Sequence, residues 1–388
     1  MLSSSDQWIF NQLLHSIRNN EISEVSFTIG ETSSSLSSKE AQTFADSLEV
    51  NHSATSLDIR ENDLDDSKLI IILESLRRHP SLTALCINGN RLADEDVPAL
   101  LDIIKDIPLL TKLDISNTDI TARGVIEILK ANIPLKELNL YGLPFENEDI
   151  KLLAKPLKTN RHLKSIYFAS LSEITEKNYQ ILMDAFKANP FLEKLHFDAT
   201  FKDNTHIYLK KIKLLSEFIR DNKTLKEIGL CEDIFNNKGT KLLADALQNN
   251  QTLTSIGLPS ISTDGRRLLV EALNKNSSLI SVNFPSGNNI NPPGFVSKMR
   301  AIARGNKQKA TELLDQLVNP KCTLSPEDYQ EISTRKAAIK AILEERQNQF
   351  PINRYKALTS HMEQYEHYIA NYMDNPLKTT GIAKNEPI

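Results

Sequence analysis

Apolar positions along this chain alternate between two periods. Short segments carry apolar residues at every second position, as Leu113 and Ile115 do, which is the pattern of a strand with one buried face. The intervening segments place apolar residues at i, i+1, i+4 and i+5, as residues 265–273 do, which is the pattern of an amphipathic helix. The chain is therefore predicted to alternate strands of about three to four residues with helices of about ten to twelve.

The strand pattern recurs ten times in one frame. Residues 81–92 read SLTALCINGNRL and fit the pattern L-x-x-L-x-L-x-x-N-x-L. The second apolar anchor of this frame recurs, at intervals of 25 to 33 residues, at Val25, Leu57, Leu85, Leu113, Leu138, Ile166, Leu195, Ile228, Ile256 and Val282. A strand and helix repeated in one direction give a parallel sheet with helices on its other side. Strands lie ~4.8 Å apart and helices ~10 Å apart, so the stack is expected to curve with its strands inside.

On these motifs, residues 21–294 resemble leucine-rich repeats of the ribonuclease-inhibitor-like subfamily. The resemblance implies an α/β fold: a right-handed solenoid, or horseshoe, with an inner parallel sheet and outer helices. Asn62 and Asn90 hold the asparagine position of the motif, where the side chain is expected to turn inward and hydrogen-bond the backbone. The resemblance is specific for fold and not for activity.

The ends of the chain depart from the repeat. Residues 1–20 are predicted to form a capping helix whose apolar residues, Trp8, Ile9, Leu13, Leu14 and Ile17, cover the first repeat. Residues 295–374 are predicted to form a C-terminal helical domain, partly a cap, with helices over 295–317, 326–347 and 353–373. Residues 375–388 are polar and predicted to be a flexible tail.

Composition narrows the classes of partner. The 388 residues carry 46 Lys+Arg against 50 Asp+Glu, a net charge of −4, and this balance disfavours nucleic acid as a partner. No apolar run reaches the about 20 residues of a membrane span. The three cysteines, Cys86, Cys231 and Cys322, are widely scattered, which indicates a reducing compartment without a disulfide framework. We therefore expect a cytoplasmic monomer, or a protein secreted into host cytosol, that needs no cofactor or metal and binds another protein.

The repeat frame also predicts which side chains face the concave surface, because residues flanking the buried anchors point to the opposite side of the sheet. Three of them, Tyr141, Tyr167 and His196, lie on successive strands and are expected to touch. Tyrosines contribute large contact area at interfaces. The candidate partner-binding residues are Asp58, Arg60, Lys112, Asp114, Glu137, Asn139, Tyr141, Tyr167, Lys194, His196 and Asp198.

Catalytic motifs are weak by comparison. Cys86 is predicted to lie about four strands from His196, on the order of 19 Å, whereas Cys231 lies one strand away, so Cys231 with His196 is the only possible dyad. Cys322 lacks the C-x-D context of bacterial ubiquitin ligases that carry leucine-rich repeats. A GTPase activator with this repeat type would use a surface arginine such as Arg60, but the acidic tail of that family is absent.

The chain is rich in Asn, Lys and Ile, has irregular repeats and ends in a polar tail. In these respects it is similar in style to leucine-rich-repeat effectors of intracellular bacterial pathogens. The prediction is a non-catalytic protein-interaction module, a secreted effector that binds a host protein through its concave face. The alternative is an enzyme or GTPase regulator, with its activity in the C-terminal helical domain or on the concave face.

Overall fold

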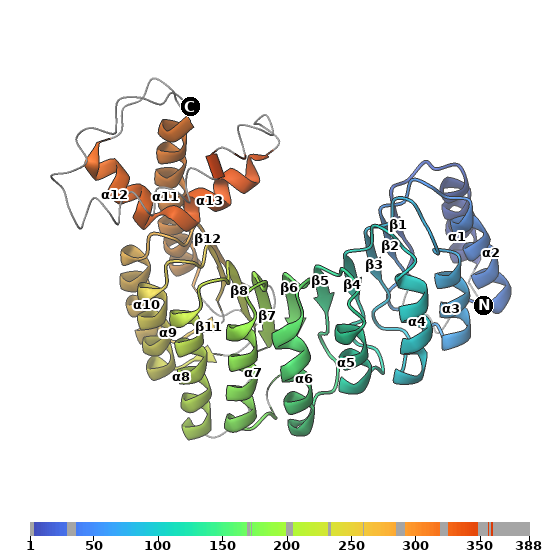
Figure 1. Cartoon of the computed structure of the whole chain (residues 1–388), viewed down its shortest axis with the longest axis horizontal. Helices are drawn as coiled ribbons and strands as arrows, with labels where there is room; N and C mark the ends of the chain where they lie inside the picture. The colour runs from blue at the N-terminus through green and yellow to red at the C-terminus, as the bar shows by residue number, and fades with distance from the viewer. Residues whose placement is uncertain are drawn as a thin grey trace. The chain divides into compact units, whose positions relative to one another are not determined.

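The computed structural model describes residues 4–28, 36–168, 171, 173–198, 205–231, 234–258, 260–284, 292–318, 325–347, 356 and 358–359. The chain divides into two compact units, Met1–Lys211 (unit 1) and Ile212–Ile388 (unit 2). The division falls within helix α8 (Thr205–Asp221). Each unit is described by itself, and Figure 1 labels the elements of both.

Unit 1 is built on short parallel strands that pair in chain order. Each buried anchor lies opposite the anchor of the next strand, as Leu57, Leu85 and Leu113 do. The strands are β1 (Glu24–Ser26), β2 (Ser56–Asp58), β3 (Ala84–Cys86), β4 (Lys112–Asp114), β5 (Glu137–Asn139), β6 (Ser165–Phe168) and β7 (Lys194–Asp198). The predicted α/β class with a parallel sheet of repeated strands is confirmed.

Helices cover one face of this sheet, and each strand leads into the next helix (Figure 1). After α1 (Ser4–Arg18), the elements are α2 (Ser38–Glu49), α3 (Asp66–Glu74), the 3-10 helix η1 (Asp94–Asp96), α4 (Val97–Ile104), α5 (Ala122–Lys130), α6 (Asn147–Thr159) and α7 (Glu176–Ala188). Helix α2 begins with a capping box: Ser37 Oγ accepts from the Glu40 backbone N–H at 3.3 Å, and the Ser37 N–H donates to Glu40 Oε2 at 2.8 Å.

The N-terminal helix buries a different stripe from the one that the sequence suggested. Trp8 and Ile9 are 66% and 53% exposed, whereas Phe10 is buried. Phe10, Leu14 and Ile17 form the buried stripe, at i, i+4 and i+7. The Phe10 ring packs against Phe27, with centroids 5.0 Å apart. The prediction for Trp8 and Ile9 was wrong because this aromatic contact sets the rotation of the helix.

Unit 2 repeats the same design with fewer strands. β8 (Glu227–Cys231), β10 (Ser255–Gly257) and β12 (Ser281–Asn283) are parallel neighbours. A second sheet, which the sequence did not predict, pairs β9 (Ile234–Phe235) with β11 (Ser260–Ile261). The helices that follow are α9 (Asn237–Asn249), α10 (Thr263–Lys275), α11 (Pro293–Val318), α12 (Pro326–Thr334) and α13 (Lys336–Glu345).

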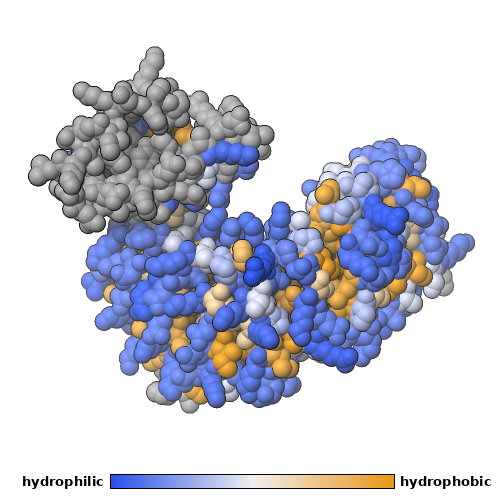
Figure 2. Space-filling view, in the orientation of Figure 1, coloured by the Kyte–Doolittle hydropathy of each residue, from blue (hydrophilic) through white to orange (hydrophobic). Residues whose placement is uncertain are grey.

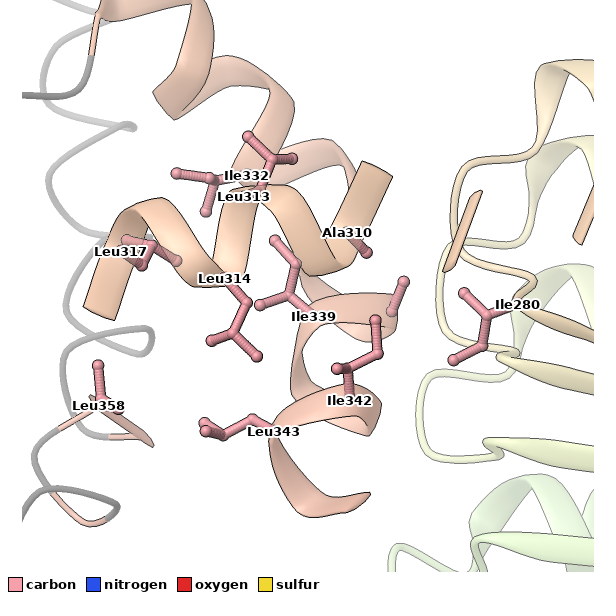
Figure 3. Packing of buried hydrophobic residues seen from close by; sticks show 11 residues of the cluster. Ile280, Ala310, Leu313, Leu314, Leu317, Ile332, Ile339, Ile342, Leu343 and Leu358 are labelled. Atoms are coloured by element: carbon pink, nitrogen blue, oxygen red, sulfur yellow. The ribbon is translucent and has the colours of Figure 1, made fainter. Parts of the chain in front are cut away.

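The C-terminal helices share one apolar cluster with the last repeat. Side chains of α11, α12 and α13 gather around Leu314 and Ile339, and Ile280, just before β12, belongs to the same cluster (Figure 3). The helix predicted over 326–347 is divided between α12 and α13 at Arg335, whose φ of −105° and ψ of 13° leave the helical region. The helix predicted over 353–373 and the tail over 375–388 lie outside the described residues. The domain boundaries predicted from the sequence remain predictions.

Two sets of asparagines tie successive repeats together. Asn62 and Asn90 turn inward as predicted: Asn90 Nδ2 donates to the carbonyls of Ile59 and Ile87, both at 3.0 Å. The second set stands three residues before the first apolar position of the repeat motif and was not predicted from the sequence. The Oδ1 atom of each member accepts from backbone N–H groups two and three residues later, and, among the described residues, the Nδ2 atom of every member except Asn222 donates to a carbonyl of the preceding repeat. Its members are Asn51, Asn160, Asn189, Asn222, Asn250 and Asn276.

His79 takes the place of an asparagine in this second set. It is 4% exposed, and among the described residues neither ring nitrogen has a hydrogen-bond partner. Burial, together with the nearby His52, lowers the pKa of His79 below its usual value. A histidine with a lowered folded-state pKa holds fewer protons than the unfolded chain just below pH 6.5, so stability falls as pH falls through that range.

We expect His79→Asn to stabilise unit 1 by about 1 kcal/mol at pH 7, because an asparagine here can make the bonds of its neighbours in the set. The gain should grow as the pH is lowered below about 6.5, since the substitution removes the buried imidazole. Urea denaturation between pH 5 and 8 measures both effects. His15→Asn, at an exposed position of α1, is the control, and identical pH profiles for His79→Asn and the parent would contradict the prediction.

Candidate functional site

The candidate site lies on the face of the unit 1 sheet that the helices leave uncovered, called here the open face. Strand pairing aligns its side chains in two rows. One row runs from Ser56 through Ala84, Lys112, Glu137 and Ser165 to Lys194. The other runs from Asp58 through Cys86, Asp114, Asn139 and Tyr167 to His196. Eight of the eleven predicted residues are members of these rows.

A pocket of about 370 Å³ opens on this face over strands β2 to β6. Its floor is the strands themselves. The side chains that line it between and beside the buried anchors are Ser56, Asp58, Ala84, Cys86, Lys112, Asp114, Glu137, Asn139 and Tyr167. This volume lies near the lower end of the range for ligand pockets, and the lining contains three carboxylates and one ammonium group.

At one end of the pocket, Asp58 holds Arg60. The Arg60 Nε donates to both carboxylate oxygens at 2.9 Å, and Nη2 donates to Oδ2 at 2.5 Å. Burial alone would raise the pKa of Asp58, but the hydrogen bonds from Arg60 outweigh it and hold the pKa below its usual value. Arg60 is thus engaged in an ion pair within its own chain, which disfavours it as a catalytic arginine supplied to a GTPase.

Asp114, at the centre of the row, is held by neutral donors. Its Oδ1 accepts from the backbone N–H of Ser116 at 2.9 Å and from the Ser116 hydroxyl at 2.6 Å. Its Oδ2 accepts from Asn139 Nδ2 at 2.9 Å. Beside it, Lys112 Nζ and Glu137 Oε1 form an ion pair at 3.0 Å. The hydrogen bonds of Ser116 were not predicted, although its spacing two residues after Asp114 is typical of a side chain that bonds locally.

Two members of the predicted aromatic cluster are in ring contact. Tyr167 and His196 stack with ring centroids 4.3 Å apart and an interplanar angle of 9°. The residue opposite Tyr167 on β5 is Asn139, and Tyr141 lies two residues beyond it, after the end of the strand. Tyr141 is 46% exposed and Tyr167 is 41% exposed. Lys194 is exposed on β7, and the side chain of Asp198 lies outside the described residues.

Cys86 is poorly suited to nucleophilic chemistry. Burial, followed by the negative charges of Asp114 and Asp58, raises the pKa of its thiol to about 12. The thiolate is the reactive form of cysteine, so almost none is present at neutral pH. The predicted pairing of Cys231 with His196 stays a prediction, because the side chain of Cys231 lies outside the described residues. Cys322 lies outside them as well.

Two further observations limit the chemistry of the described residues. No helix among them is long and apolar enough to cross a membrane. No group of three or more His, Cys, Asp or Glu side chains that could hold a metal ion is found in the same part of the chain. Most surface residues coloured in Figure 2 are hydrophilic, and apolar ones form small separate patches.

Comparison with known proteins gives a likeness in fold. No protein-family model matches the sequence, and no curated protein matches it. Among solved structures, the chain is similar to the leucine-rich repeat-containing protein LegL7 from Legionella pneumophila, with a TM-score of 0.50 and 15% identity. That match covers 73% of this chain and 91% of LegL7.

Two other solved structures match with lower TM-scores. One is leiomodin-1 actin-binding site 2, with a TM-score of 0.29, 17% identity, and coverage of 50% of this chain and 95% of that chain. The other is TLR13 in complex with ssRNA13, with a TM-score of 0.36, 18% identity, and coverage of 62% and 35%. The repeated strand and helix of each unit, together with the likeness to LegL7, show that this chain has the leucine-rich-repeat fold.

Proposed function

We propose that this protein is a non-catalytic interaction module that binds a protein partner with the open face of unit 1. The observation that carries the proposal is that side chains of this face are already held in place by their neighbours. Asp58, Asp114 and Tyr167 are each held by a neighbouring side chain, and together they line a pocket. Side chains that are already fixed lose little conformational entropy when a partner binds.

The raised pKa of Cys86 and the ion pair of Arg60 with Asp58 both favour binding over catalysis. We further propose that the protein is a bacterial effector secreted into host cytosol, where its partner is a host protein. That part of the proposal rests on sequence features alone: the abundance of Asn, Lys and Ile, the irregular repeats and the polar C-terminal segment.

We expect simultaneous replacement of Tyr141, Tyr167 and His196 by alanine to weaken partner binding by about 2 kcal/mol or more, roughly 30-fold. Binding energy at interfaces concentrates in a few aromatic side chains, and truncating them removes that contact area. The measurement is affinity capture from eukaryotic and bacterial lysates with identification by mass spectrometry, followed by titration of the captured protein.

The control is Leu109→Ala combined with Leu152→Ala, which removes apolar side chains that are 49% and 61% exposed outside the open face. The control should bind as the parent does, and all variants should keep the parent's unfolding midpoint. Undiminished capture by the triple variant would overturn the open-face proposal. A partner found only in bacterial lysate would overturn the effector proposal.

A further inference from the structure

The pocket of the open face contains a carboxylate whose orientation is fixed and which could bind a cation of a partner. Asp114 lies at its centre, and its two oxygens accept hydrogen bonds from Ser116 and Asn139. All these donors are neutral. Among the described residues, no cationic side chain forms an ion pair with Asp114, whereas Asp58 has Arg60 and Glu137 has Lys112. Asp114 is therefore oriented by neutral donors, and the charge of Arg60 acts on it without forming an ion pair.

The surroundings of Asp114 favour positive charge. Cys86 lies between Asp58 and Asp114 in the row, and the pKa of its thiol is raised by burial first and by those two carboxylates second. Cys86 itself is uncharged, so the charged groups that line this part of the pocket are Asp58 and Asp114. On the other side, Tyr167 lines the pocket, and its ring is kept in place by the stack with His196. A cation beside a carboxylate and an aromatic ring gains both an ion pair and a cation–π contact.

The open face already holds one guanidinium group. Arg60 binds Asp58 through Nε and Nη2, in the bidentate manner that suits a carboxylate. This ion pair is local, since Arg60 follows Asp58 by two residues, and it gives the geometry in which a carboxylate of the row binds a guanidinium group. Asp114 lies two strands further along the same row.

We propose that the pocket binds an arginine or lysine side chain from a basic segment of the partner protein, with the cation paired to Asp114 and packed against Tyr167. This inference rests on the proposed function and specifies the chemistry of the partner. Arginine is the better fit where both carboxylate oxygens are used, and lysine would bind as a point charge.

The test uses the full chain and four fluorescein-labelled peptides of one length. They carry three arginines, three lysines, three citrullines or three glutamates, spaced by Gly and Ser. Measured by fluorescence anisotropy, the arginine and lysine peptides are expected to bind at least tenfold more tightly than the citrulline peptide. The glutamate peptide is expected not to bind. Citrulline keeps the shape of arginine without its charge, so this comparison isolates the cation.

Asp114→Asn is expected to weaken binding of the arginine peptide at least tenfold. Asp184→Asn, which removes the same charge from an exposed position of α7, should change binding less than twofold at physiological salt. Tyr167→Phe should bind as the parent does, and Tyr167→Ala should bind less tightly. Far-ultraviolet circular dichroism measures whether the Asp114→Asn variant is folded. If it is not, the comparison of Tyr167→Phe with Tyr167→Ala tests the proposal in its place.

Absence of binding by the cationic peptides, equal binding of arginine and citrulline, or equal effects of Asp114→Asn and Asp184→Asn would overturn the proposal. Its failure is separable from that of the proposed function. A captured partner could be lost by the triple variant of Tyr141, Tyr167 and His196 but still bind the Asp114→Asn variant. That result would support the open face as the interface and would overturn only the proposed cation pocket.

Discussion

Truncation after Gly294 is expected to lower the unfolding midpoint of the protein by about 10 °C and to make it aggregate. Ile280 is 8% exposed within the apolar cluster that α11, α12 and α13 complete, and exposing such a side chain costs about 2 kcal/mol. Helix α11 also extends the second asparagine set: Asn306 Nδ2 donates at 2.9 Å to the carbonyls of Asn276 and Leu279. These bonds contribute about 1 kcal/mol each, and the sum of about 4 kcal/mol shifts a midpoint by roughly 2–4 °C per kcal/mol.

Differential scanning fluorimetry and size-exclusion chromatography measure this outcome. The control is deletion of residues 375–388, which the sequence predicts to be a polar tail and which should leave the midpoint unchanged. A protein cut at Gly294 that stays monomeric with the parent's midpoint would show that the C-terminal helices fold independently of the last repeat. That result would strengthen the alternative of an enzymatic C-terminal domain.

Leu113→Ala is expected to destabilise unit 1 by about 2–5 kcal/mol. Leu113 is 2% exposed, and in β4 it lies between Leu85 and Leu138 of the neighbouring strands. Truncating such a side chain removes buried methyl groups and leaves a cavity that the repeats on either side cannot fill by moving independently. Urea denaturation followed by circular dichroism measures the loss.

The adjacent Lys112 is the matched control, because it has the same strand and neighbours but the opposite face. Its side chain is 53% exposed and its ion pair with Glu137 lies on the surface, so Lys112→Ala should change stability by no more than about 0.5 kcal/mol. Similar losses for the two variants would contradict the assignment of buried and open faces.

The sequence by itself determined the repeat architecture. Leu57, Leu85 and Leu113 recur at nearly constant intervals and meet in register as predicted, because the fold buries one anchor of every repeat beside the next. Of the eleven candidate residues that the same frame named, strand pairing aligns eight on the open face, since side chains alternate across a strand. The capping box at Ser37 and the inward turns of Asn62 and Asn90 were also readable, because their hydrogen bonds are made with nearby backbone groups.

Tertiary structure decided the rest. The rotation of α1 depends on the contact of Phe10 with Phe27. The periodicity of α1 alone contains no information about this contact, so it could not predict that Trp8 and Ile9 are exposed. The position of Tyr141 beyond the row of Tyr167 depends on where β5 ends.

The pocket and the neutral donors around Asp114 arise from side chains of several repeats. The contact of Asp114 with Asn139 joins residues 25 positions apart in the chain, whereas its contacts with Ser116 are local. Their geometry is set by strand register and side-chain rotamers together, and a pattern of apolar positions specifies the register alone.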